Sequence, residues 1–106
     1  MRSRPVTVLI ALLLFAGAAG PANAASWAGL QPNAMRCLQQ GQLSACQAAI
    51  LQAEALAQRA TARNAYPCQT LLLGLQADFI MQQLGDGRGE KALAAVAATG
   101  RGCAGL

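Results

Sequence analysis

The stretch that decides the fold runs from Pro67 to Leu84 and reads PCQTLLLGLQADFIMQQL. On a helical wheel its apolar side chains lie almost all the way round; they are Leu71, Leu72, Leu73, Leu75, Phe79, Ile80, Met81 and Leu84. A helix that is apolar on nearly every side usually forms the buried centre of a fold. A membrane span is the competing interpretation, but Asp78 and four glutamines within these 18 residues make insertion costly. We therefore expect a core helix over 67–84.

Residues 44–62, before this segment, predict an amphipathic helix. Its inner side would carry Cys46, Ala49, Ile50, Ala53, Leu56, Ala57 and Ala60. Ser44 and Gln47 have the spacing of a capping box, which would start the helix at Ser44. Many inner positions are alanine, so neighbouring helices can approach closely.

Two shorter helices are expected outside this pair. Pro32 or Asn33 would open the first, after an extended lead over 25–31, and Gly41 would end it. On the other side, the glycine-rich run 85–89 predicts a turn. A fourth helix would follow over 90–99 and end at Gly100. No segment has the period-two alternation of a strand, so we predict an all-α, up-and-down bundle of about four helices in two hairpins.

Four cysteines, Cys37, Cys46, Cys68 and Cys103, are expected to cross-link this bundle. They form neither the close pairs of a metal site nor a Cys-x-x-Cys redox motif. In an up-and-down bundle Cys37 and Cys46 lie at one end and Cys68 and Cys103 at the other. The sequence therefore predicts the disulfides Cys37–Cys46 and Cys68–Cys103, with roughly 2.7 and 3.8 kcal/mol of stabilisation from loop closure.

The first 24 residues have the pattern of a cleaved signal peptide. Arg2 and Arg4 precede the apolar run Val6–Ala16, and small residues follow, up to the Ala22-Asn23-Ala24 cleavage motif. The apolar run is shorter than the ~20 residues of a membrane helix, which disfavours a retained anchor. We expect cleavage between Ala24 and Ala25, and a single helical domain over 25–106. The pattern indicates general secretory export in a bacterium, to a periplasmic, lumenal or secreted location.

Charge and residue types after the predicted cut disfavour several function classes. Residues 25–106 carry six basic and four acidic residues, a net charge of +2, and the basic residues are scattered. We therefore expect no nucleic-acid partner. The chain has no histidine, its only serines after the cut are Ser26 and Ser44, and no sequence spacing forces Glu54 and Asp78 together. No catalytic residues, cofactor or metal are expected.

Two function classes rank ahead of an enzyme, which comes third. The first is a non-catalytic exported protein that binds another exported protein or has a structural role, without a stable transmembrane segment after cleavage. The second is a membrane-active or lipid-binding module. In being small, mildly cationic, helical and cross-linked, the chain resembles saposins and bacteriocins, and that resemblance implies contact with lipid. A lysine-rich helix face opposite an aromatic one, which would favour lipid contact, is missing.

Overall fold

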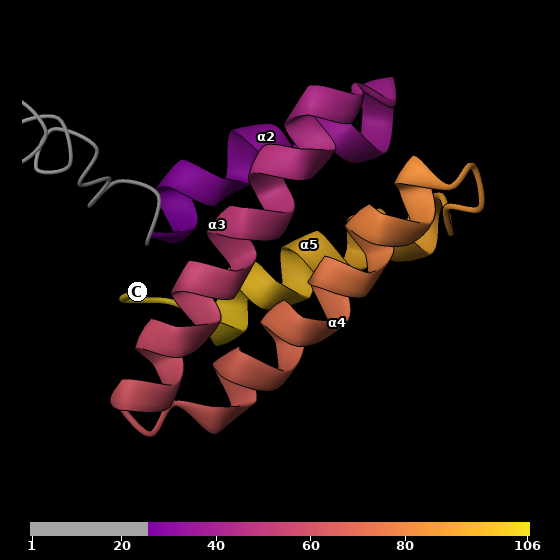
Figure 1. Ribbon diagram of the computed structural model, residues 1–106. Coiled ribbons are helices and arrows are strands. Elements are labelled where there is room, and N and C mark those ends of the chain that lie inside the picture. The colour runs from indigo at the N-terminus through magenta and orange to yellow at the C-terminus, as the bar shows by residue number, and fades with distance from the viewer. Residues whose placement is uncertain (1–25) are drawn as a thin grey trace, which may run out of the picture.

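The chain forms a bundle of antiparallel helices. A computed structural model describes residues 26–106, and this part of the chain contains four helices and no strand. The helices are α2 (Trp27–Gln40), α3 (Leu43–Ala62), α4 (Tyr66–Gln83) and α5 (Glu90–Gly102). Successive helices run in opposite directions and are joined by short turns (Figure 1). The predicted all-α, up-and-down bundle is therefore confirmed.

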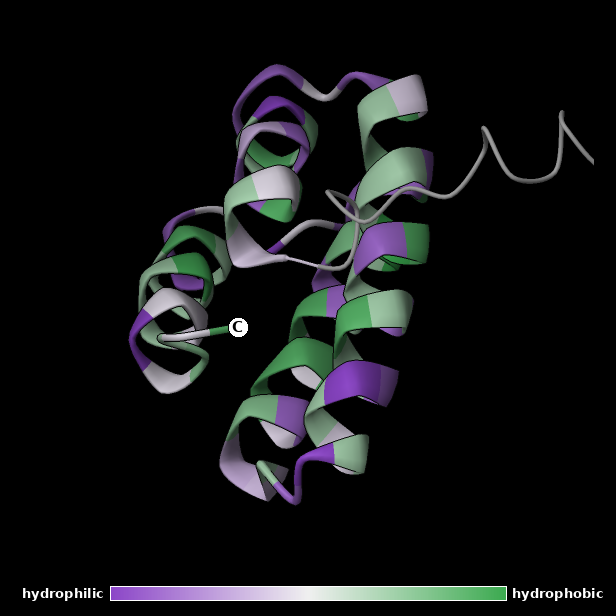
Figure 2. Ribbon diagram, turned by 90° about the vertical axis from the view of Figure 1, so that its left-hand side faces the viewer, coloured by the Kyte–Doolittle hydropathy of each residue, from purple (hydrophilic) through white to green (hydrophobic). Residues whose placement is uncertain are grey.

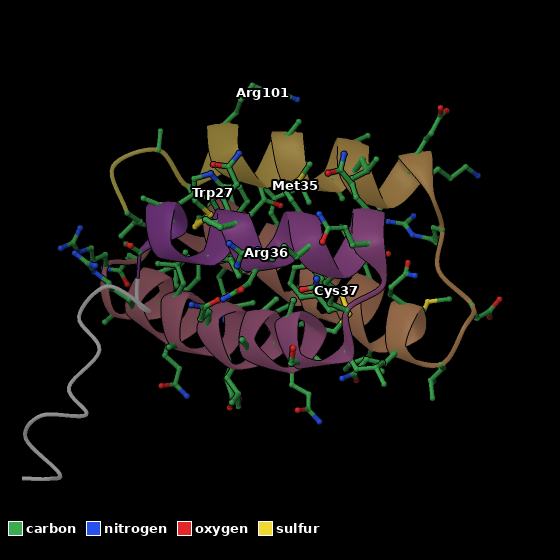
Figure 3. The ribbon with its side chains drawn as sticks, turned by 90° about the horizontal axis from the view of Figure 1, so that it is seen from above. Trp27, Met35, Arg36, Cys37 and Arg101 are labelled. Atoms are coloured by element: carbon green, nitrogen blue, oxygen red, sulfur yellow. A yellow bond between two sulfur atoms is a disulfide. The ribbon has the colours of Figure 1, made fainter. Side chains whose placement is uncertain are left out.

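The four helices are arranged as a ring. α3 packs between α2 and α4, α5 packs against both α4 and α2, and α2 also touches α4 across the centre. Seen from above, α2 lies between α5 and α3, and α4 lies beneath it (Figure 3). The ring closes where the Trp27 backbone N–H donates to the Leu106 carbonyl at 3.3 Å. α4 packs against the other three helices with its buried side, which carries Leu72, Leu75 and Phe79.

Large side chains from three helices and alanines from α3 fill the centre. The fully buried large apolar side chains are Leu30, Leu56, Leu72, Leu75 and Phe79. The buried alanines of α3 are Ala45, Ala49, Ala53, Ala57 and Ala60. Alanine removes the bulk that would otherwise separate two helix axes, so α2 and α4 both approach α3 closely. The inner side predicted for 44–62 is confirmed except at Ile50, which is half-buried.

Both predicted disulfides form, one at each end of the bundle. Cys37 and Cys46 flank the turn between α2 and α3, with 4.6 Å between their Cα atoms. Cys68 and Cys103 join the start of α4 to the residue after α5, with 4.8 Å between their Cα atoms. All four side chains are at most 1% exposed. The bridges therefore belong to the core as well as closing the two ends.

The start of the first helix differs from the prediction. α2 begins at Trp27, so the expected extended lead over 25–31 and a start at Pro32 or Asn33 are wrong for the described residues. The Ser26 hydroxyl accepts a hydrogen bond from the Gly29 N–H at 3.0 Å and caps the helix. Pro32 lies inside α2 and has no backbone N–H, so the helical hydrogen bond to the carbonyl of Ala28, an exposed residue, is missing. Burial of Leu30 in the core offsets the lost hydrogen bond.

Two helix boundaries further along also differ. α3 begins at Leu43 with Gln42 as its N-cap, so the capping box at Ser44 and Gln47 does not form. Gly41 ends α2 in the left-handed conformation (φ 64°), as predicted, and α3 follows too soon for Ser44 to act as the cap. α5 continues through Gly100 to Gly102. A Cβ on Gly100 would lie 3.0 Å from the Trp27 ring nitrogen, so this glycine allows α2 and α5 to pack closely.

Candidate interaction surface on the hairpin of α3 and α4

The exposed large apolar side chains of residues 26–106 all belong to one hairpin. Leu43 and Leu51 lie on α3, Tyr66, Leu73 and Ile80 on α4, and Leu84 directly after α4. Neither α2 nor α5 contributes one. We call this set of six side chains the hairpin face. In Figure 2, where colour gives hydropathy, the turns are mostly purple, whereas much of the ribbon of the helices is green.

Six exposed residues form a stripe along α4 and its C-cap. We define the α4 stripe as Tyr66, Thr70, Leu73, Ala77, Ile80 and Leu84, all of them exposed. Their spacing alternates between four and three residues, so on a helix they fall within an arc of about 80°. The core residues Leu72, Leu75 and Phe79 project to the opposite side. The stripe has the a/d spacing that helices use to pack against one another.

The exposed stripe corrects the interpretation of 67–84 as a helix buried all round. The side of α4 that faces α2, α3 and α5 is buried as predicted, but Leu73 is 50% and Leu84 76% exposed. The helices of residues 26–106 pack on the buried side of α4 and leave its stripe exposed. None of the helices in that range has both the length and the apolarity needed to cross a membrane.

α3 contributes the exposed side chain of Leu51 beside the stripe. The Gln76 side-chain amide of α4 donates to the Ile50 carbonyl of α3 at 3.2 Å, which sets the two helices side by side at this level. Leu51, the next residue on α3, is 66% exposed and lies level with the middle of the stripe. The exposed residues around it, Gln47, Glu54 and Gln58, are polar, and one of them is charged.

The exposed surface of α4 carries no charge. Asp78 is the only charged residue of the helix, and it lies on the buried side, 3% exposed. Arg88, in the turn before α5, binds both carboxylate oxygens: Nε donates to Oδ1 at 2.6 Å and a terminal nitrogen to Oδ2 at 2.8 Å. The hydrogen bond with Asp78, and then its negative charge, raise the pKa of Arg88. This ion pair attaches the glycine-rich turn to the core and leaves the stripe neutral.

The structure separates the other polar residues considered in the sequence. Glu54 is exposed on α3, whereas Asp78 is buried and bound to Arg88, so the two carboxylates do not form a pair. Ser26 is a helix cap and Ser44 is exposed in the first turn of α3. The predicted cleavage position, Ala24 and Ala25, lies outside the described residues. Within residues 26–106, no cluster of three potential metal ligands and no pocket is present.

Sequence reasoning missed the ion pair and the stripe, although the chain contains a signal for each. A single acid in an otherwise uncharged helix needs a cation, and Arg88 is the nearest one along the chain. The four-and-three spacing from Tyr66 to Leu84 was hidden by the apolar residues between its members. No model of a known protein family matches the chain, and neither do the curated proteins or the solved structures compared with it.

Proposed function

We propose that this protein is a small exported binding module rather than an enzyme, and that it binds an exported protein through the hairpin face. The observation that carries the proposal is that all six exposed large apolar side chains of residues 26–106 lie on one hairpin. Summed over the six side chains, these exposed fractions correspond to on the order of 600 Å², compared with about 300–600 Å² for the largest contiguous apolar patch on a typical monomer.

Two further properties of this surface support a protein partner. The exposed residues of α4 are uncharged, and depletion of charge is typical of the centre of a protein interface. The disulfides hold the helices that carry the surface, so binding would cost little conformational entropy. The same disulfides are compatible with an oxidising compartment outside the cytoplasm, in agreement with the predicted export.

The lipid-binding alternative has less support from the composition of α4. Helices that lie on a membrane surface usually have lysine or arginine along the edges of their apolar side. α4 contains neither residue, and its stripe is bordered by Gln69, Gln76 and Gly74. These borders favour a protein surface over an anionic lipid surface.

Site-specific photo-crosslinking tests the proposed surface. A photoreactive amino acid replaces Ile80 on the stripe or, as a matched control, Ala94, which is exposed on α5. The protein is recovered after export, where its intact mass should be that of a chain that begins at Ala25 and lacks one hydrogen per cysteine. We expect protein adducts from position 80 and none from position 94.

Three results would contradict the proposal. Equal adducts from positions 80 and 94 would show that the hairpin face is not selective, and no adduct from either would show that it is not used. Sedimentation with vesicles of phosphatidylglycerol and phosphatidylethanolamine that disappears in Ile80→Glu would assign the surface to lipid instead.

A further inference from the structure

We propose that the partner of the α4 stripe is a second copy of this chain, packed antiparallel to the first across a two-fold axis. This inference rests on the proposed function, because it names the occupant of the same surface. The axis would cross the stripe halfway along its length, at the level of residue 75. Three observations support it: the order of side-chain sizes along α4, the position of Leu51, and the area available for burial.

The order of side-chain sizes makes the stripe complementary to itself when reversed. Antiparallel pairing about the level of residue 75 sets Thr70 of one copy opposite Ile80 of the other, and Leu73 opposite Ala77. Each small side chain of the stripe then receives a large one, as knobs-into-holes packing requires. At the two ends the Tyr66 ring lies against Leu84, the most exposed large apolar residue of the described chain.

A parallel pair would lose this fit. Each residue would then meet its own copy, so Leu73 would abut Leu73 and Ala77 would face Ala77. Large side chains would hold the helices apart at one level and leave a gap at the next. The sequence of α4 therefore selects the antiparallel arrangement.

The position of Leu51 on α3 agrees with the same axis. Ile50 lies level with Gln76, because the amide of Gln76 donates to the Ile50 carbonyl. A two-fold axis at the level of residue 75 consequently brings the Leu51 side chains of the two copies together. Glu54 lies nearly one turn further along α3, off the axis, so the two copies do not oppose their carboxylates.

The available area predicts a weak dimer. The hairpin face offers on the order of 600 Å² per copy, against about 800 Å² per partner in a standard interface. We expect a dissociation constant on the order of 10 µM, at the weak end of specific association. The predicted signal peptide precedes α2, and α2 packs on the buried side of α4, opposite the stripe. The experiment uses the chain that begins at Ala25, so the signal peptide cannot compete for the stripe.

Sedimentation equilibrium tests the pairing with two single variants and their mixture. Leu73→Ala leaves a gap opposite Ala77, and Ala77→Leu sets two leucines against each other. Each variant alone should raise the dissociation constant about 10-fold. In a dimer of one variant with the other, the alanine introduced at position 73 meets the leucine introduced at position 77, and at the symmetric contact Leu73 meets Ala77. The mixed dimer should therefore recover wild-type affinity within about 3-fold.

A control separates pairing from an effect on the fold. Ala97→Leu adds the same side chain to the exposed side of α5 and should leave the dissociation constant unchanged. A wild-type chain that stays monomeric at about 200 µM, twenty times the expected constant, would overturn the dimer. So would a mixture no tighter than either variant. If position 80 still gave adducts with a different protein, the proposed function would survive that failure.

Discussion

The two sides of α4 have nearly the same composition but opposite environments. Leu72 and Leu73 are adjacent in sequence, and so are Phe79 and Ile80, yet the first of each pair is fully buried and the second is 44–50% exposed. The inner side packs against α2, α3 and α5, whereas the outer side is largely open to solvent. Burial here depends on which helices lie beside α4 and not on how apolar its residues are.

Truncation of one residue on each side gives the largest expected contrast. Phe79→Ala removes a fully buried ring and should lower the free energy of unfolding by about 3–5 kcal/mol. The matched change on the outer side, Ile80→Ala, should cost less than about 1 kcal/mol, because its side chain is already half in water. Urea denaturation monitored by circular dichroism measures both losses. The protein concentration is kept below the dissociation constant of the proposed dimer, so that only the monomer unfolds. Equal losses would contradict the assignment of inner and outer sides.

Removal of the disulfide at the first turn of α4 gives the second-largest expected effect. Replacing Cys68 and Cys103 by alanine opens a link between residues 35 apart and should cost roughly 3.8 kcal/mol. The matched control replaces Cys37 and Cys46, which are 9 apart, and should cost roughly 2.7 kcal/mol. A larger loss for the shorter link in urea denaturation would show that native packing, and not loop closure, sets the contribution of each bridge.

Removal of the Arg88 charge, which neutralises Asp78 on the inner side of α4, gives the smallest of the three effects. Arg88→Ala leaves the buried Asp78 carboxylate without its partner and should lower the melting temperature by about 5–10 °C. The loss stays moderate because Arg88 lies in a turn that water can reach. Replacing the pair together, with Asp78→Leu and Arg88→Met, should recover most of it. A double variant no more stable than Arg88→Ala would contradict this account.

The pH dependence of the Arg88→Ala effect follows from the raised pKa of Arg88. A basic group whose pKa is raised by folding contributes its full stability below its unfolded pKa and loses it only as the pH rises through the folded value. For arginine that range lies far above neutrality. The difference in melting temperature between wild type and Arg88→Ala should therefore stay constant from about pH 6 to about pH 9.

The bundle and its disulfides could be predicted because both follow from local patterns. Two turns that contain glycine, and the short break before Pro67, separate four helical segments, and short connections force neighbours to be antiparallel. That topology leaves one pairing of the cysteines in which both members of each pair lie at the same end. The inner side of α3 also follows from its period, since its alanines and Leu56 recur at helical spacing.

The remaining features depend on contacts between distant segments. The Ser26 cap at the start of α2 is a local signal, but Trp27 also packs against Gly100 of α5, which leaves room for the indole, and that contact is not visible in the local sequence. Arg88 reaches Asp78 only after the turn has folded back onto α4. The exposed side of α4 depends on the absence of a further helix beside it in the described chain, and an all-round apolar pattern carries no information on which side that is.

The order of the bridges along the chain has a consequence for biogenesis. The first cysteine bonds to the second and the third to the fourth, so neither link encloses or crosses the other. In a chain that is threaded through a translocation channel from its N-terminus, the first two thiols to emerge are already native partners. Oxidation in order of emergence thus gives the correct connectivity, and such a chain can mature with a thiol oxidant alone, without an enzyme that shuffles mispaired cysteines.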